Sequence, residues 1–110
     1  MNTTDVKDLE LFNTNLDRLL HSIGIAHVLA TTMTQRMTDH KQKYPNMDDA
    51  KIEDLFRREL HEKELAVRAD YDSMIMRAVT CGFDIPFSID EILNYIESSI
   101  NESLQNHYRF

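Results

Sequence analysis

Residues 9–37, LELFNTNLDRLLHSIGIAHVLATTMTQRM, decide the fold of this chain. Apolar side chains recur through the stretch at alternating steps of three and four residues, at Leu9, Phe12, Leu16, Leu19, Ile23, Ala26, Ala30, Met33 and Met37. This spacing places them along one stripe of an α-helix, whereas a strand repeats every two residues. The stretch therefore predicts one long helix, which we extend to residues 5–43.

Two features compete with a continuous helix here. Gly24 lies near the middle, where glycine costs about 1 kcal/mol relative to alanine, so the helix either kinks or divides there. The threonines at 31, 32 and 34 favour β-structure, and a strand over residues 25–34 is the local alternative. Because the apolar stripe keeps its phase across Gly24, the sequence favours continuity.

A turn and a second helix follow. Proline moves the residue before it out of helical geometry, so Pro45 ends the first helix, and Asn46 suits an N-cap. The second helix is predicted over residues 47–81, with Gly82 ending it and Phe83 supplying an apolar contact. Its exposed face carries four acid–base pairs at i,i+4 spacing, namely Glu53–Arg57, Asp54–Arg58, Glu59–Lys63 and Glu64–Arg68.

A third helix is predicted over residues 89–106. Ser88 and Glu91 have the spacing of a capping box, in which each side chain bonds the backbone N–H of the other. The apolar stripe of this helix comprises Ile89, Ile92, Leu93, Ile96, Ile100 and Leu104. We therefore expect an all-α chain with one helical domain over residues 1–110, built from a long antiparallel hairpin and a shorter third helix.

The position of the turn sets the register of the hairpin. If the first two helices fold back at Pro45, apolar residues of one meet apolar residues of the other, as in Leu16 with Met74, Ile23 with Val67, and Ala30 with Leu60. Large side chains then face small ones at several layers, as an interdigitating core requires. The one polar residue on this seam is Glu64, opposite Ala26.

The third helix is too short to cover the whole hairpin. It extends about 28 Å, against about 50–58 Å for each long helix. Joined at Gly82, it is expected to lie beside residues 5–23 and 64–81 and to leave the other arm open. That arm carries apolar side chains away from the main stripe, at Ile25, Val28, Leu29 and Leu55. Unpartnered apolar groups indicate another chain, so these residues are predicted to form a homodimer interface that completes a helical bundle.

The net charge of −7 is unevenly distributed. Residues 1–43 carry five acidic and five basic side chains, whereas residues 82–110 carry five acidic and one basic. A chain without a basic stripe is not expected to bind nucleic acid directly or to attach to an anionic membrane. The acidic residues of the third helix are instead predicted to face a basic partner surface; they are Asp90, Glu91, Glu97 and Glu102.

Motifs that carry chemistry are not found in the sequence. No two of the five histidines are three or four residues apart, and Cys81 is interpreted as a small buried residue. The acidic pairs Glu59–Glu62 and Asp70–Asp72 lack a matching pair on another helix. There is no phosphate-binding loop and no nucleophile elbow. We therefore expect no metal, no cofactor and no catalysis.

The function expected from the sequence is association with other proteins. A cytoplasmic, homodimeric helical protein would act as an adaptor, chaperone or regulator of a larger complex, and its protein partner is not identified by the sequence. Two alternatives stay open. An acidic nucleic-acid mimic that inhibits a DNA-binding protein is suggested by residues 82–110, although the neutral charge of residues 1–43 argues against it. A small helical-bundle enzyme or metal carrier is the other.

Overall fold

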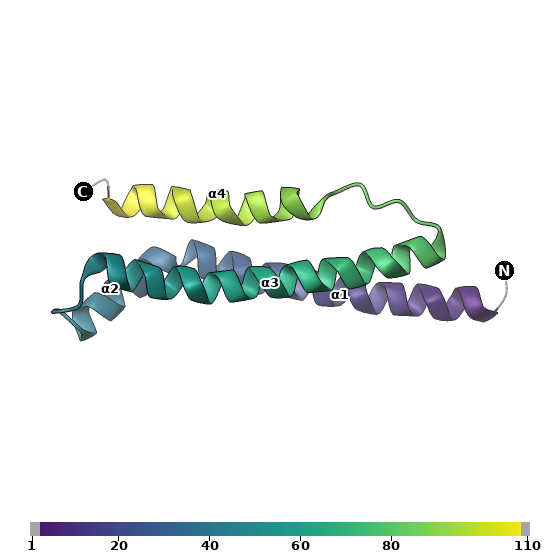
Figure 1. The fold of residues 1–110 in the computed structure, drawn as a ribbon, viewed down its shortest axis with the longest axis horizontal. Helices are drawn as coiled ribbons and strands as arrows, with labels where there is room; N and C mark the ends of the chain where they lie inside the picture. Colours follow the sequence, from purple (N-terminus) through teal and green to yellow (C-terminus); the bar gives the residue numbers. More distant parts are fainter. Residues whose placement is uncertain (1–2, 109–110) are drawn as a thin grey trace.

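The computed structural model describes the backbone of residues 3–108 and the side chains of residues 6–102. Within this part of the chain there are no strands; the helices are α1 (Thr3–Thr31), α2 (Met33–Lys43), α3 (Asp49–Cys81) and α4 (Ile89–Tyr108). They form a rod of 63 × 22 × 15 Å (Figure 1). The prediction of an all-α fold with a long hairpin and a shorter final helix is confirmed. The predicted side-chain role of Leu104 lies outside the described residues.

The hairpin pairs α1 and α2 with α3 in the predicted register. The side-chain amide of Asn15 donates to the carbonyl of Ser73 at 3.4 Å, and the hydroxyl of Ser22 donates to the carboxylate of Asp70. In both pairs, the α3 residue lies within two positions of the one that the turn at Pro45 predicts to face its α1 partner. The side chains buried along this seam are Leu19, Ala26, Ala30, Met33, Met37, Ile52, Leu60, Val67, Met74 and Ala78. The apolar stripe of residues 9–37 therefore forms the core as expected from its spacing.

The first long helix is interrupted at Thr32, which separates α1 from α2. Thr32 has φ −98° and ψ 4°, and its hydroxyl donates to the carbonyl of Val28 at 2.7 Å. The same carbonyl also accepts the Thr32 backbone N–H at 3.0 Å. Such side-chain bonding to the preceding turn bends helices. The prediction of one unbroken helix over residues 5–43 is therefore wrong at Thr32, whereas continuity through Gly24 is confirmed and the alternative strand over residues 25–34 is not formed.

The ends of α3 follow from local capping. The helix begins at Asp49, two residues later than predicted, because Asp48 rather than Asn46 is its N-cap and accepts the N–H of Ala50 at 3.3 Å. At the other end, Gly82 adopts the predicted left-handed conformation with φ 76°. The cap is closed by a backbone bond from residue 83 to the carbonyl of residue 78 at 2.8 Å.

The start of α4 also matches the prediction. The N–H of Glu91 donates to the Ser88 hydroxyl at 3.1 Å, and the N–H of Ser88 donates to the Glu91 carboxylate at 3.4 Å. Below the cap, Ile96 and Ile100 are fully buried against the hairpin. The capping box and the apolar stripe therefore fix where α4 begins and which side of it faces inward.

The part of the hairpin that α4 covers differs from the prediction. Residues 82–88 do not turn tightly; they run back along the hairpin (Figure 1), and the Tyr71 hydroxyl donates to the carbonyl of Phe87 at 2.7 Å. Seven extended residues span about 20 Å, so α4 begins beside the middle of the rod and lies against α1, α2 and α3 on the arm predicted to be open. The expected position beside residues 5–23 and 64–81 is wrong. The end formed by the start of α1 and the last turns of α3 extends beyond α4 instead (Figure 1).

Candidate interaction surfaces

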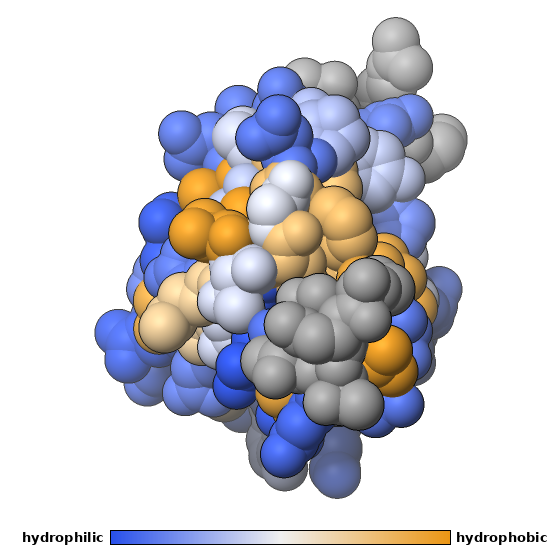
Figure 2. Space-filling view, turned by 90° about the vertical axis from the view of Figure 1, so that its right-hand side faces the viewer, coloured by the Kyte–Doolittle hydropathy of each residue, from blue (hydrophilic) through white to orange (hydrophobic). Residues whose placement is uncertain are grey.

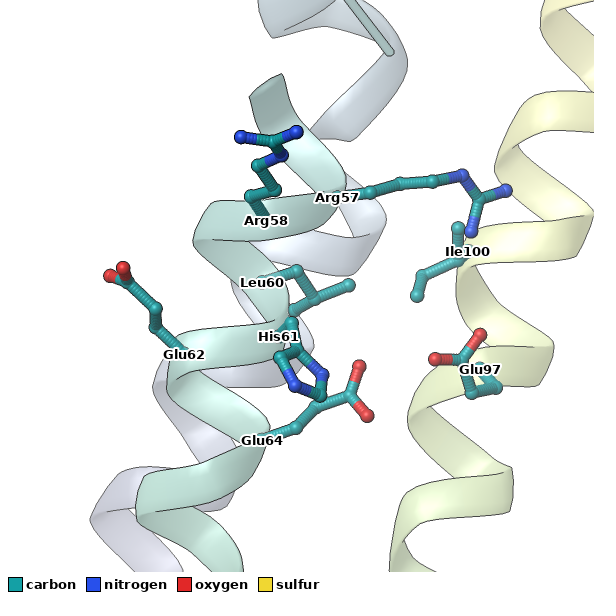
Figure 3. A pocket seen from close by; sticks show the side chains of 8 residues that line it. All are labelled: Arg57, Arg58, Leu60, His61, Glu62, Glu64, Glu97 and Ile100. Carbon is teal, nitrogen blue, oxygen red and sulfur yellow. The ribbon is translucent and has the colours of Figure 1, made fainter. Parts of the chain in front are cut away.

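The side of the hairpin away from α4, which we call the rear face, is located by helix geometry. The His27 ring of α1 stacks on Tyr95 of α4, with ring centroids 5.2 Å apart, and Glu64 of α3 faces α4 as well (Figure 3). Successive residues in a helix are about 100° apart, so Ile25 lies about 160° from His27 and Leu55 lies about 180° from Glu64. Both apolar side chains therefore belong to the rear face.

The four residues of the predicted interface differ in exposure. The side chains of Ile25, Val28 and Leu55 are 39%, 56% and 44% exposed. Val28 lies about 60° around α1 from Ile25, at the outer edge of the rear face. Leu29 is half-buried and packs against the core of its own chain, so it offers little free surface. The premise that α4 leaves this arm entirely open was wrong, but one side of the arm does keep exposed apolar groups.

Two polar pairs on the rear face are formed within the chain. Arg36 bonds Glu59 at 2.7 Å and also lies over the Phe56 ring, 4.8 Å from its centroid. Glu59 thus reaches across to α2, instead of pairing with Lys63 along α3 as predicted. The predicted pairs that do form are Glu53–Arg57 at 3.5 Å and Asp54–Arg58 at 2.9 Å. The Arg36–Glu59 and Ser22–Asp70 pairs satisfy polar groups on this face. A partner that covers the face would therefore bury fewer unpaired polar groups.

The acidic side chains of α4 do not all lie on one face. Asp90, Glu91 and Glu102 are exposed, and Glu91 is engaged in the capping box. Glu97 is half-buried and turns toward α3 (Figure 3). The predicted row of four partner-facing carboxylates is therefore wrong at Glu97, which also removes one member from the charge series that a nucleic-acid mimic would present.

A cavity of about 480 Å³ lies between α3 and α4. Figure 3 shows the side chains that line it, namely Arg57, Arg58, Leu60, His61, Glu62, Glu64, Glu97 and Ile100. The carboxyl groups of Glu64 and Glu97 point toward each other across it. Burial, a hydrogen bond with Glu97 and the charge of Glu97 raise the pKa of Glu64 to about 7.

The sequence did not predict this acidic pair, because its i,i+4 spacing placed Glu64 in a surface pair with Arg68. The available signal was the position of Glu64 on the apolar seam of the hairpin, where a carboxylate is out of place. The identity of its neighbour depended on where α4 lies, and that position was predicted incorrectly. Sequence pattern alone therefore marked Glu64 as unusual without giving its partner.

Two of the histidines make contacts within the fold. His27 bonds the Tyr95 hydroxyl at 3.2 Å, and His40 packs against Tyr44 and Phe56 with ring centroids 4.8 and 5.6 Å away. Cys81 is a half-buried free thiol. Among residues with described side chains, no group of three or more His, Cys, Asp or Glu is arranged to hold a metal ion.

The end of the rod where α1 and α3 extend beyond α4, which we call the two-helix end, exposes a further apolar surface. The third helix was predicted to cover this surface. Met76 and Val79 of α3 are 72% and 73% exposed, and Phe83 and Val6 are 43% and 49% exposed. Figure 2 looks onto this end and shows hydrophobic surface across its middle. The exposure follows from the extended loop, because residues 82–88 carry α4 away from this end.

None of the helices in the described part of the chain is both long enough and apolar enough to cross a membrane. Comparison with known proteins found no matching family model, no matching curated protein and no matching solved structure.

Proposed function

We propose that this chain is a non-catalytic interaction protein that acts by protein–protein association, as an adaptor, chaperone or regulator of a larger complex, and that it works as a homodimer. The observation that carries the proposal is the presence of Ile25, Val28 and Leu55 as exposed apolar groups on one side of a helical rod. Side chains held on helices are presented in fixed positions, which favours a specific contact over a diffuse one.

A second copy of the chain is the proposed occupant of the rear face. A two-fold axis brings the same patch of both copies together, so each of the three apolar side chains is buried once in each copy. Burying the exposed half of six such side chains gains roughly 5–9 kcal/mol. Association costs about 4–15 kcal/mol. Because the two terms are of the same order, the dimer is expected to dissociate on dilution.

A different protein is the proposed second partner. Asp90 and Glu102 are exposed on α4, and a chain with net charge −7 associates faster with a basic surface than with an acidic one. A cytoplasmic location belongs to the same proposal, since a single cysteine suits a reducing compartment.

Light scattering coupled to size exclusion tests the homodimer. The 12.9 kDa chain should elute with a mass of about 26 kDa at high micromolar concentration and shift toward the monomer on dilution. Val28→Glu places two carboxylates near each other in the dimer, so it should give a monomer with unchanged helicity by circular dichroism.

Val79→Glu is the matched control, because Val79 is at least as exposed but lies at the two-helix end. It should leave the dimer intact. A monomeric wild-type chain, or dissociation by Val79→Glu in place of Val28→Glu, would contradict the proposed interface.

A further inference from the structure

The contact between α3 and α4 is the weaker side of the packing of α4. This helix lies mainly against α1 and α2 and meets α3 at fewer places. Its tether, residues 82–88, is extended and begins at Gly82, whose positive φ ends α3. A helix held on one side and joined through an extended segment can move away from its weaker contact without disturbing the hairpin.

Two carboxyl groups face each other at this contact. Glu64 comes from α3 and Glu97 from α4, and both are half-buried beside the cavity between the helices (Figure 3). When both are ionised, like charges repel across the contact; when one holds a proton, it donates a hydrogen bond to the other. The same pair therefore either opposes or supports the packing of α4 on α3.

Two charged neighbours of the pair have other partners, and a third points away from α4. On α3, Arg57 bonds Glu53 and Arg58 bonds Asp54, while Glu62 points away from α4 (Figure 3). The remaining ionisable neighbours are His61 at the cavity, Arg68 one turn along α3, and His27 of α1, which bonds the Tyr95 hydroxyl at 3.2 Å. Within the described residues, neither carboxylate of the pair has an ion-pair partner.

We propose that Glu64 and Glu97 form a proton-operated latch, which holds α4 against α3 when one proton is shared and loosens that contact when both carboxyl groups are ionised. Loosening would uncover Leu60 of α3 and Ile100 of α4, which are buried beside this contact. The latch would thus control a second apolar surface, on the opposite side of the hairpin from the rear face.

The direction of the pH dependence follows from the acidity of the pair. The docked state raises the pKa of Glu64 from 4.5 to about 7, so docking takes up a proton between these values. The stabilisation of the α3–α4 contact by this proton is fully present below about pH 4.5 and is lost as the pH rises through 7. The α3–α4 contact should therefore tighten on acidification and loosen above neutrality.

Backbone hydrogen–deuterium exchange at pH 5.5 and 8.5, corrected for the intrinsic exchange rate, tests the latch. In the wild type, protection of residues 92–102 should fall by roughly tenfold at pH 8.5, which is less than the full pKa difference allows because the pair is partly solvated. Protection of residues 66–78 should not change. Glu97→Gln should keep α4 protected at both pH values, since the amide donates to Glu64 without a titrating proton.

Two further variants make the result decisive. Glu62→Gln removes a carboxylate that lines the same cavity but points away from α4, and it should behave as the wild type does. Glu64→Gln removes the other half of the pair and should abolish the pH dependence as Glu97→Gln does, so that poor folding of one variant leaves the other. Equal α4 protection at both pH values in the wild type, or retained pH dependence in both glutamine variants, would overturn the latch.

Discussion

Single side chains in this protein show how burial follows from helical spacing. Leu19 and Leu20 are chemically identical neighbours, yet Leu19 is fully buried and Leu20 is 56% exposed. Leu19 belongs to the 3–4 repeat of residues 9–37, whereas Leu20 lies about 100° away around α1. The buried member of the pair could be identified from the sequence, because the repeat extends far enough to define one stripe.

Alanine substitution of Leu19 and Leu20 measures how much each side chain contributes to the free energy of unfolding. Leu19→Ala should lower the free energy of unfolding by about 2–5 kcal/mol, since it removes buried methyl groups and leaves a cavity. Leu20→Ala should change it by less than about 1 kcal/mol. Denaturant titration followed by circular dichroism checks both values. Similar losses in the two variants would mean that the core stripe is placed on the wrong side of α1.

At the scale of single elements, the sequence predicted what is decided locally and missed what is decided by tertiary contacts. The capping box at Ser88 and the left-handed Gly82 could be predicted, because each depends on residues within one turn. The position of α4 could not, because it depends on an extended loop fixed by a bond between Tyr71 and Phe87. The break at Thr32 was not predicted, because Thr32 was interpreted as favouring a strand, whereas its hydroxyl bonds the preceding turn and interrupts the helix.

The two glycines should respond in opposite directions to the same substitution. Gly24 lies inside α1, and a Cβ there would meet nothing within 4 Å, so Gly24→Ala should raise the free energy of unfolding by about 0.5–1 kcal/mol. Gly82 has φ 76°, and Gly82→Ala should lower the same free energy by about 1 kcal/mol or more. Stabilisation by both substitutions, measured by denaturant titration, would argue against the left-handed cap.

For the whole molecule, the rod shape creates more surface than one short helix can cover. A body of 63 × 22 × 15 Å built on a two-helix hairpin leaves apolar groups on the rear face and at the two-helix end. The sequence predicted that some apolar surface stays exposed, since the helix lengths alone require it. It misplaced α4, and with it the Glu64–Glu97 pair, because the third helix was expected to fold back directly from Gly82, whereas residues 82–88 run back along the hairpin before α4 begins.

Inter-copy distances between spin labels test the central claim, that a second copy occupies the rear face. In a Cys81→Ser background, labels at Val28→Cys should give a short distance by double electron–electron resonance, since Val28 lies at the edge of the proposed contact. Labels at Val79→Cys, at the two-helix end, should give a longer one. No dipolar signal from Val28→Cys at high concentration, or a shorter distance from Val79→Cys, would contradict the account.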